Sequence, residues 1–182
     1  EDASKPVRTL SVRIVGPSEQ LTNNQIVVSI PNVRKPVPLF IVFRALGIVS
    51  DKDIITYCLL DLNVNKKYID LFVPSVHDAG SIFTQENALK YIALLTKGKT
   101  NTHAHEILMN YFLPHIGELN FRNKAYYLGF IVFKLLRVSL KEELPTDRDN
   151  FKFKRVELPG TLLYDLFKEY YTIAQNMIFK KF

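Results

Sequence analysis

One segment, residues 36–49, constrains the fold of this chain more than any other because it is apolar on almost every side. Pro38 fixes a backbone angle that suits the first turn of a helix, and Gly47 suits the left-handed residue that follows a helix end. A helix that is apolar all round must be enclosed by other elements. We therefore expect the centre of the core at Phe40, Val42, Phe43 and Leu46.

Arg44 interrupts this apolar helix. A buried guanidinium group needs a partner, because burying an unpaired charge costs several kcal/mol. We therefore expect Arg44 to form a structural salt bridge or to lie at the edge of the packed face, and we favour these structural roles over a functional one.

The rest of the chain predicts one α+β domain that is mostly helical, with an antiparallel strand pair near the N-terminus. Apolar and polar residues alternate over 9–15 and again over 26–30, which indicates the two strands. Helical spacing of apolar residues marks later segments: 50–62, opened by a capping box at Ser50, and 66–72, 84–95, 105–113, 121–140 and 162 to near the C-terminus. Within 121–140, Lys124 is placed off the apolar stripe.

Composition and charge exclude several classes of protein. The 182 residues suit a single domain over 1–182, and the one cysteine, Cys58, excludes an intramolecular disulfide framework. The chain carries 24 Lys+Arg against 18 Asp+Glu, and this net charge of +6 permits a polyanionic partner without requiring one. The longest apolar stretch is too short to cross a membrane. A start without Met or a secretory signal is typical of a segment excised from a longer chain.

No pattern of residues predicts a catalytic or metal centre. His103 and His105 are two residues apart, whereas zinc ligands on one helix are four apart. The sequence Gly98-Lys99-Thr100 lacks the earlier glycine of a phosphate-binding loop. We therefore expect no catalytic residue, no metal site and no cofactor in this segment.

The charged and irregular segment 144–160 contains the candidate binding site. Its residues 147–155 hold four cations, two anions and two aromatic side chains. Cations interleaved with aromatic groups suit both the neutralisation of nucleic-acid phosphates and the stacking of bases. The alternative is a solvated loop without a binding role. The residues alone favour neither phosphate contact nor a solvated loop.

Four blocks of this sequence resemble, in order, blocks of the second-largest subunit of multisubunit DNA-directed RNA polymerases. Residues 36–51 resemble its F-R-A-L-G helix, 112–116 its F-L-P-H-[IV] block and 124–130 its K-A-[FY]-[FY]-[LF]-G-[YF] block. Residues 147–163 are similar to its D-R-D-H-x-G-x-K-R block and the L-[AP]-G-x-L-L that follows, although Asn150 and Lys152 replace the usual His and Gly. The chain thereby resembles the lobe domain of that subunit, of nuclear, archaeal or large-DNA-virus type.

This resemblance implies a non-catalytic lobe that forms one wall of the DNA cleft, near the downstream duplex and the non-template strand. The implied partners are DNA, the other polymerase subunits and domains, and initiation factors, with no membrane. The implied location is intracellular: the nucleus in a eukaryote, or the virion or a cytoplasmic factory for a virus. Nucleotidyl transfer would belong to other parts of the polymerase.

The implied DNA-binding residues lie in the last block. Asp149, Lys154 and Arg155 match motif positions that approach the non-template strand, and we add Arg148 and Lys152 on charge alone. The alternative function is a protein-interaction module that docks initiation factors or other acidic partners.

Overall fold

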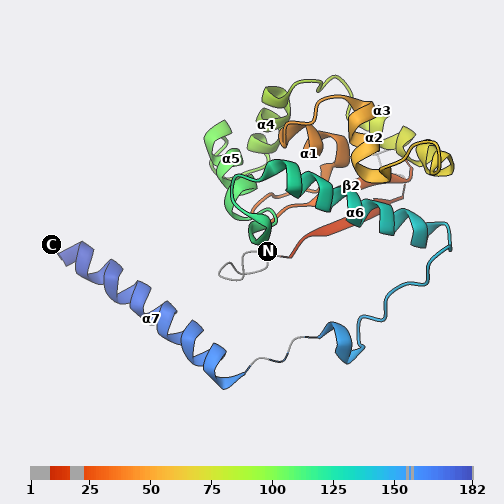
Figure 1. Ribbon diagram of the computed structural model, residues 1–182. Coiled ribbons are helices and arrows are strands. Elements are labelled where there is room, and N and C mark those ends of the chain that lie inside the picture. Colours follow the sequence, from red (N-terminus) through yellow and green to blue (C-terminus); the bar gives the residue numbers. More distant parts are fainter. Residues whose placement is uncertain (1–8, 17–22, 155, 157, 182) are drawn as a thin grey trace. The chain divides into compact units, whose positions relative to one another are not determined.

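The computed structural model describes residues 9–16, 23–154, 156 and 158–181 (Figure 1). The chain divides into two compact units, Glu1–Leu144 and Pro145–Phe182. The predicted fold class is confirmed, because the described residues form a mostly helical α+β structure with one small antiparallel sheet. The assignment of residues 1–182 to a single domain stays a prediction.

The sheet lies in the N-terminal unit and has three antiparallel strands in the order β1-β2-β3. The predicted strand pair is confirmed, since β1, Ser11–Val15, pairs with β2, Gln25–Ser29. A third strand, β3, spans Val37–Pro38 and pairs with the other side of β2. The sequence did not predict β3, because two residues are too few to show alternation. β2 is therefore central, and its first four residues are buried.

Helix α1, Leu39–Ala45, is the centre of the core. All of its residues are buried, and so is Leu46 just beyond it, which confirms the predicted enclosed helix. Pro38 precedes the helix instead of opening it, and Gly47 adopts a φ of +100° after the helix end. Glycine reaches that angle without steric cost, so Gly47 lets the chain turn sharply toward the next helix.

The other helices of the N-terminal unit pack around α1 and the sheet (Figure 1). They are α2, Asp51–Leu59; the 3₁₀ helix η1, Lys66–Phe72; α3, Val73–Asp78; α4, Gln85–Leu94; α5, Asn101–Asn110; the 3₁₀ turn η2, Pro114–Ile116; and α6, Phe121–Ser139. Helix α1 contacts α2, α3 and α4, whereas α6 contacts α2 and β1. Contacts to several helices explain why α1 is apolar on all sides.

Helices α5 and α2 also differ from the sequence prediction at their N-terminal ends. Helix α5 begins at Asn101, ahead of the predicted start at 105, because the Thr100 Oγ1 accepts a hydrogen bond from the His103 backbone N–H at 3.3 Å and caps the helix. Ser50 precedes α2, but its side chain makes no capping hydrogen bond. The predicted capping box is therefore wrong.

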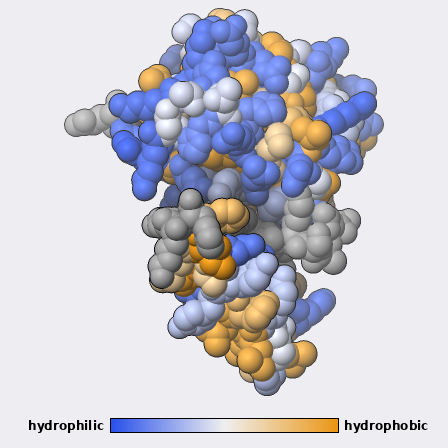
Figure 2. Space-filling view, turned by 90° about the vertical axis from the view of Figure 1, so that its left-hand side faces the viewer, coloured by the Kyte–Doolittle hydropathy of each residue, from blue (hydrophilic) through white to orange (hydrophobic). Residues whose placement is uncertain are grey.

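The C-terminal unit contains the 3₁₀ turn η3, Phe151–Phe153, and one long helix, α7, Pro159–Lys181. The side chains that are described on α7 are exposed, and many of them are apolar or aromatic. Hydrophobic residues are coloured orange in Figure 2. Within the part of the chain that the structure describes, no helix is both long and apolar enough to cross a membrane. An apolar helix surface of this kind is typical of a site that another protein segment covers.

Candidate functional site

Residues 147–154 form a turn that is held by its own side chains. The Asp147 Oδ1 accepts a hydrogen bond from the Asp149 backbone N–H at 3.0 Å, and the Asn150 Oδ1 accepts one from the Lys152 backbone N–H at 3.0 Å. Short polar side chains that bond to backbone two residues ahead favour turns over regular helices. Asn150 therefore starts η3 with a defined geometry, although it departs from the histidine of the resembled block.

The two lysines of this turn lie over exposed aromatic rings. The Lys152 Nζ is 5.7 Å from the centroid of the Phe153 ring, and the Lys154 Nζ is 5.5 Å from the centroid of the Phe151 ring. Phe151 is 85% exposed and Phe153 is 56% exposed. Both distances are within the range of cation–π attraction. The turn therefore presents positive charge next to exposed aromatic rings.

The structure brings four of the five predicted DNA-binding residues into this turn. Arg148, Asp149, Lys152 and Lys154 are exposed there, whereas Arg155 lies outside the described residues. The Lys154 Nζ is 3.6 Å from the Asp149 Oδ1, so Asp149 offsets part of the charge that a phosphate would meet. This ion pair is exposed and salt weakens it readily. Among the described residues, Arg148 and Lys152 have no carboxylate partner.

Arg44 has a structural role. Its side chain is 1% exposed, its Nη2 donates to the Asp51 Oδ1 at 2.5 Å, and its Nη1 donates to the Ile82 carbonyl oxygen. The guanidinium carbon also lies 5.3 Å from the centroid of the Phe83 ring. The predicted salt bridge is confirmed, and Arg44 joins α1 to the start of α2 and to the segment before α4.

Lys124 is fully buried, so its predicted place off the apolar stripe of α6 is wrong. Its Nζ donates hydrogen bonds to the carbonyl oxygens of Leu108 and Met109, both at 2.8 Å. These carbonyls lie in the last turn of α5, where the helix dipole favours a positive charge. Lys124 therefore attaches α6 to the C-terminal end of α5.

Gly129 allows α6 to pack closely against α2. A Cβ atom at this position would lie 2.3 Å from the Tyr57 carbonyl oxygen and 3.2 Å from the Cα of Cys58. Beside this contact the Tyr57 ring stacks on the Tyr126 ring, with 4.2 Å between centroids. Lys124 and Gly129, both from the block 124–130, thus fix the packing of α6 against α5 and α2.

The described side chains that suit metal binding or nucleophilic chemistry are dispersed. Within the described ranges, no three His, Cys, Asp or Glu side chains are grouped so as to hold a metal ion. The His103 Nδ1 is 3.6 Å from the Glu106 Oε2, and the His105 ring packs edge-on against Phe121 with 5.2 Å between centroids. Burial raises the pKa of the Cys58 thiol far above its ordinary value, which suppresses the reactive thiolate.

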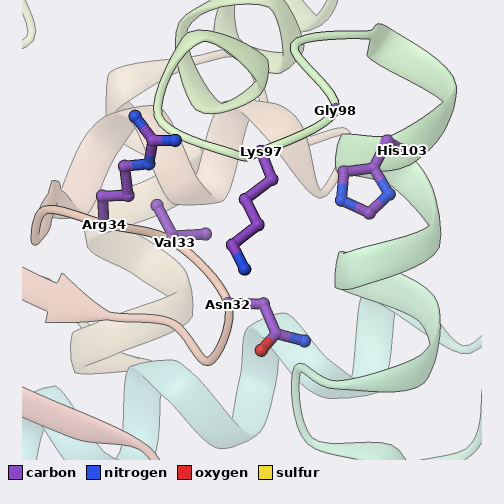
Figure 3. A pocket seen from close by; sticks show the side chains of 6 residues that line it. All are labelled: Asn32, Val33, Arg34, Lys97, Gly98 and His103. Carbon is purple, nitrogen blue, oxygen red and sulfur yellow. The ribbon is translucent and has the colours of Figure 1, made fainter.

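A cavity of about 660 Å³ opens in the N-terminal unit (Figure 3). Its walls come from the turn after β2, the connection between α4 and α5, and the first turn of α5, and they are lined by Asn32, Val33, Arg34, Lys97, Gly98 and His103. The Arg34 backbone N–H donates to the Leu95 carbonyl oxygen at 3.0 Å and holds two of these walls together. The sequence did not predict this cavity, because only tertiary contacts bring residues 34 and 97 together.

Comparison with known proteins identifies the family of this chain. A family model described as RNA polymerase Rpb2, domain 2, matches residues 14–157. DNA-directed RNA polymerase II subunit RPB2 of Schizosaccharomyces pombe is 30% identical over 188 residues, covering 99% of this chain and 16% of that protein. DNA-directed RNA polymerase II subunit 2 of Arabidopsis thaliana is 36% identical over 92% of this chain and 15% of that protein. DNA-directed RNA polymerase subunit Rpo2 of Saccharolobus shibatae is 35% identical over 88% of this chain and 14% of that protein.

The chain therefore spans about one sixth or less of the length of these curated relatives. The family match covers all of the turn 147–154 and all of the described N-terminal unit from residue 14, which includes Arg44, Lys124 and Gly129. On this evidence the chain belongs to the domain 2 family of the second-largest subunit of DNA-directed RNA polymerase.

Proposed function

We propose that this segment is the lobe of a DNA-directed RNA polymerase, a non-catalytic wall of the cleft that contacts downstream and non-template DNA. Its family and the names of its relatives support a place in an RNA polymerase. The observation that carries the DNA contact is the turn 147–154, where Lys152 and Lys154 lie over exposed phenylalanine rings. Cations neutralise phosphates and ring faces stack on unpaired bases, so this turn offers both contacts to a melted strand.

The proposed DNA contact is weak in isolation. Each phosphate that is neutralised contributes about 0.9 to the salt slope on duplex DNA and about 0.7 on a single strand, and this turn reaches only a few phosphates. In an assembled polymerase the other walls of the cleft already hold the DNA, so the same contacts act at a high effective concentration. The other polymerase subunits and initiation factors are the remaining proposed partners, and the proposed location is intracellular, nuclear in a eukaryote.

A second contact is proposed between α7 and the rest of the parent subunit. The family model ends at residue 157, before α7 begins at Pro159. The matched relatives are at least six times as long as the stretch they share with this chain, so most of such a subunit lies outside it. A neighbouring domain of the same polypeptide is the occupant that we propose for the apolar surface of α7, because covalent continuity keeps it close.

Fluorescence anisotropy with a labelled fork-shaped DNA, at several salt concentrations, tests the DNA contact. We expect a variant with Lys152, Lys154 and Arg155 changed to Glu to bind every DNA sequence more weakly than the unchanged chain. Its salt slope should fall by about 0.7 to 0.9 for each phosphate contact that is lost. Its melting temperature should stay nearly the same, because the described part of the turn is exposed and hydrogen-bonded to itself.

A matched control variant distinguishes the effect of losing cations in the turn from the effect of lowering the net charge of the chain. Lys52, Lys66 and Lys168 are exposed and lie outside the turn, so changing all three to Glu alters the net charge by the same amount. This control should keep most of the DNA affinity. Equal losses in both variants, or an unchanged salt slope in the turn variant, would contradict the proposal and favour the module that docks an acidic partner.

A further inference from the structure

We propose that the cavity lined by Arg34, Lys97 and His103 binds the phosphate groups of a small anionic ligand, either an inorganic oligophosphate or a nucleotide. The cavity belongs to the N-terminal unit, whereas the turn 147–154 of the DNA contact proposed above belongs to the C-terminal unit, so the two proposals rest on different residues. Its volume of about 660 Å³ is in the range of about 300 to 1,000 Å³ that is usual for small-molecule sites.

The charged residues that line the cavity are cations. Arg34 and Lys97 supply two permanent cations, and none of the six lining residues is acidic; the carboxylate of Glu106 lies behind the imidazole, with its Oε2 3.6 Å from the His103 Nδ1. The two segments that form most of its walls, 31–35 and 96–103, contain four Lys or Arg residues and no Asp or Glu. Within the described residues, neither Arg34 nor Lys97 forms an ion pair with a carboxylate. Arg34 and Lys97 are exposed, and a concave surface that carries unpaired cations raises the local concentration of small anions.

The arrangement of donors fits a chain of phosphates. Figure 3 shows the Lys97 side chain extending toward Asn32, with the His103 imidazole on the other side of the cavity. The ammonium, amide and imidazole groups can each donate a hydrogen bond. The Arg34 guanidinium points away from the Lys97 ammonium, so the positive charge is distributed along the cavity. Separated cations match two or three linked phosphates better than they match one carboxylate.

Backbone contacts hold the walls in place before any ligand arrives. The Arg34 backbone N–H donates to the Leu95 carbonyl oxygen, and the His103 backbone N–H donates to the Thr100 Oγ1. A Cβ atom on Gly98 would lie 2.8 Å from the His103 Cδ2, so glycine lets the backbone approach the imidazole ring. Walls that are already ordered lower the entropy cost of binding.

Isothermal titration calorimetry of the 182-residue chain at low salt tests this site with sodium triphosphate, sodium pyrophosphate and ATP as probes. We expect a saturable signal that weakens by about tenfold or more when Arg34 and Lys97 are both changed to Ser, because each contributes a charge-assisted hydrogen bond. The control variant has Lys52 and Lys66 changed to Ser. It loses the same charge at exposed positions outside the cavity and should retain the affinity.

Amide chemical shifts locate the bound probe, and we expect the largest changes at Gly98 and His103. Tighter binding of ATP than of triphosphate would identify a nucleotide as the ligand, and equal binding would identify the phosphate chain alone; either result supports the site. The proposal is overturned if millimolar probe gives no signal, if the control variant weakens binding equally, or if the shifts gather in 147–154. Preferential binding of a glutamate-rich peptide or of DNA at the cavity would also overturn it.

Discussion

Replacing Gly129 with alanine should change the stability of the protein in two opposite ways, through helix propensity and through packing. Gly129 lies inside α6, and alanine is favoured over glycine in a helix interior by about 1 kcal/mol. Propensity alone therefore predicts a more stable protein. The structure predicts the opposite, because the new Cβ would lie 2.3 Å from the Tyr57 carbonyl oxygen and 2.9 Å from the carbonyl carbon.

The size of the effect follows from that contact. Carbon and oxygen atoms approach each other to about 3.3 Å even in a weak hydrogen bond, so α2 and α6 must separate by about 1 Å. The obstacle is the backbone of α2, which cannot rotate away as a side chain can. Overpacking a core costs about 1 to 3 kcal/mol, and a rigid obstacle puts this case at the upper end. After the gain of about 1 kcal/mol from propensity, we expect a net loss of about 2 kcal/mol.

Thermal unfolding followed by far-UV circular dichroism measures this loss. The melting temperature should fall by about 4 to 8 °C, since 1 kcal/mol corresponds to about 2 to 4 °C in a chain of this length. The control is Gly160→Ala in α7, where the added Cβ meets open space, and it should leave the melting temperature unchanged or raise it. If Gly129→Ala melts at or above the temperature of the unchanged chain, the close approach of α2 and α6 is refuted.

Two further predictions concern the core and the acid limit of stability. Phe43 is fully buried in α1, so Phe43→Ala should lower the free energy of unfolding in urea by about 3 to 5 kcal/mol, and a loss under about 1 kcal/mol would show that α1 is not the centre of the core. Hydrogen bonds from the Lys67 Nζ and the Tyr68 Oη, both at 2.5 Å, hold the pKa of Glu142 below its ordinary value of 4.5. A lowered carboxyl pKa stabilises the fold above the unfolded-state pKa, and that contribution is lost as pH falls through the folded-state pKa. Glu142→Gln should therefore flatten the fall in melting temperature below about pH 4.5, and a pH profile that matches the unchanged chain would contradict this.

Elements with a distinct apolar pattern were predictable from the sequence. Alternation of apolar and polar residues located β1 and β2, and an almost wholly apolar segment located α1. Strand β3 and helix α3 were not predicted, because two and six residues carry too little periodicity. β3 exists as a strand only through its pairing with β2, which is a tertiary contact.

The placement of buried charge was harder to predict than the placement of helices. Lys124 was placed off the apolar stripe because lysine is polar, yet carbonyl oxygens at the end of α5 supply its partners. For Arg44 the sequence predicted a structural salt bridge or a position at the edge of the packed face, but it did not predict the partners, and Ile82, one of its two hydrogen-bond partners, lies 38 residues away. Periodicity shows which face of a helix is buried, but the partners on that face depend on how distant segments meet.

Some of the resembled blocks place their side chains between helices, and another exposes them to solvent. A match therefore means something different for function in each block. Arg44, Lys124 and Gly129 act between helices, so a match at these positions carries information about shape. The turn 147–154 is held by hydrogen bonds within itself and displays its cations, so a match there carries information about a partner. Changing the turn should therefore alter binding and spare stability, whereas changing the interhelical residues should alter both. Measuring DNA affinity and unfolding on the same set of variants separates these two roles, because only substitutions in the turn should move affinity alone.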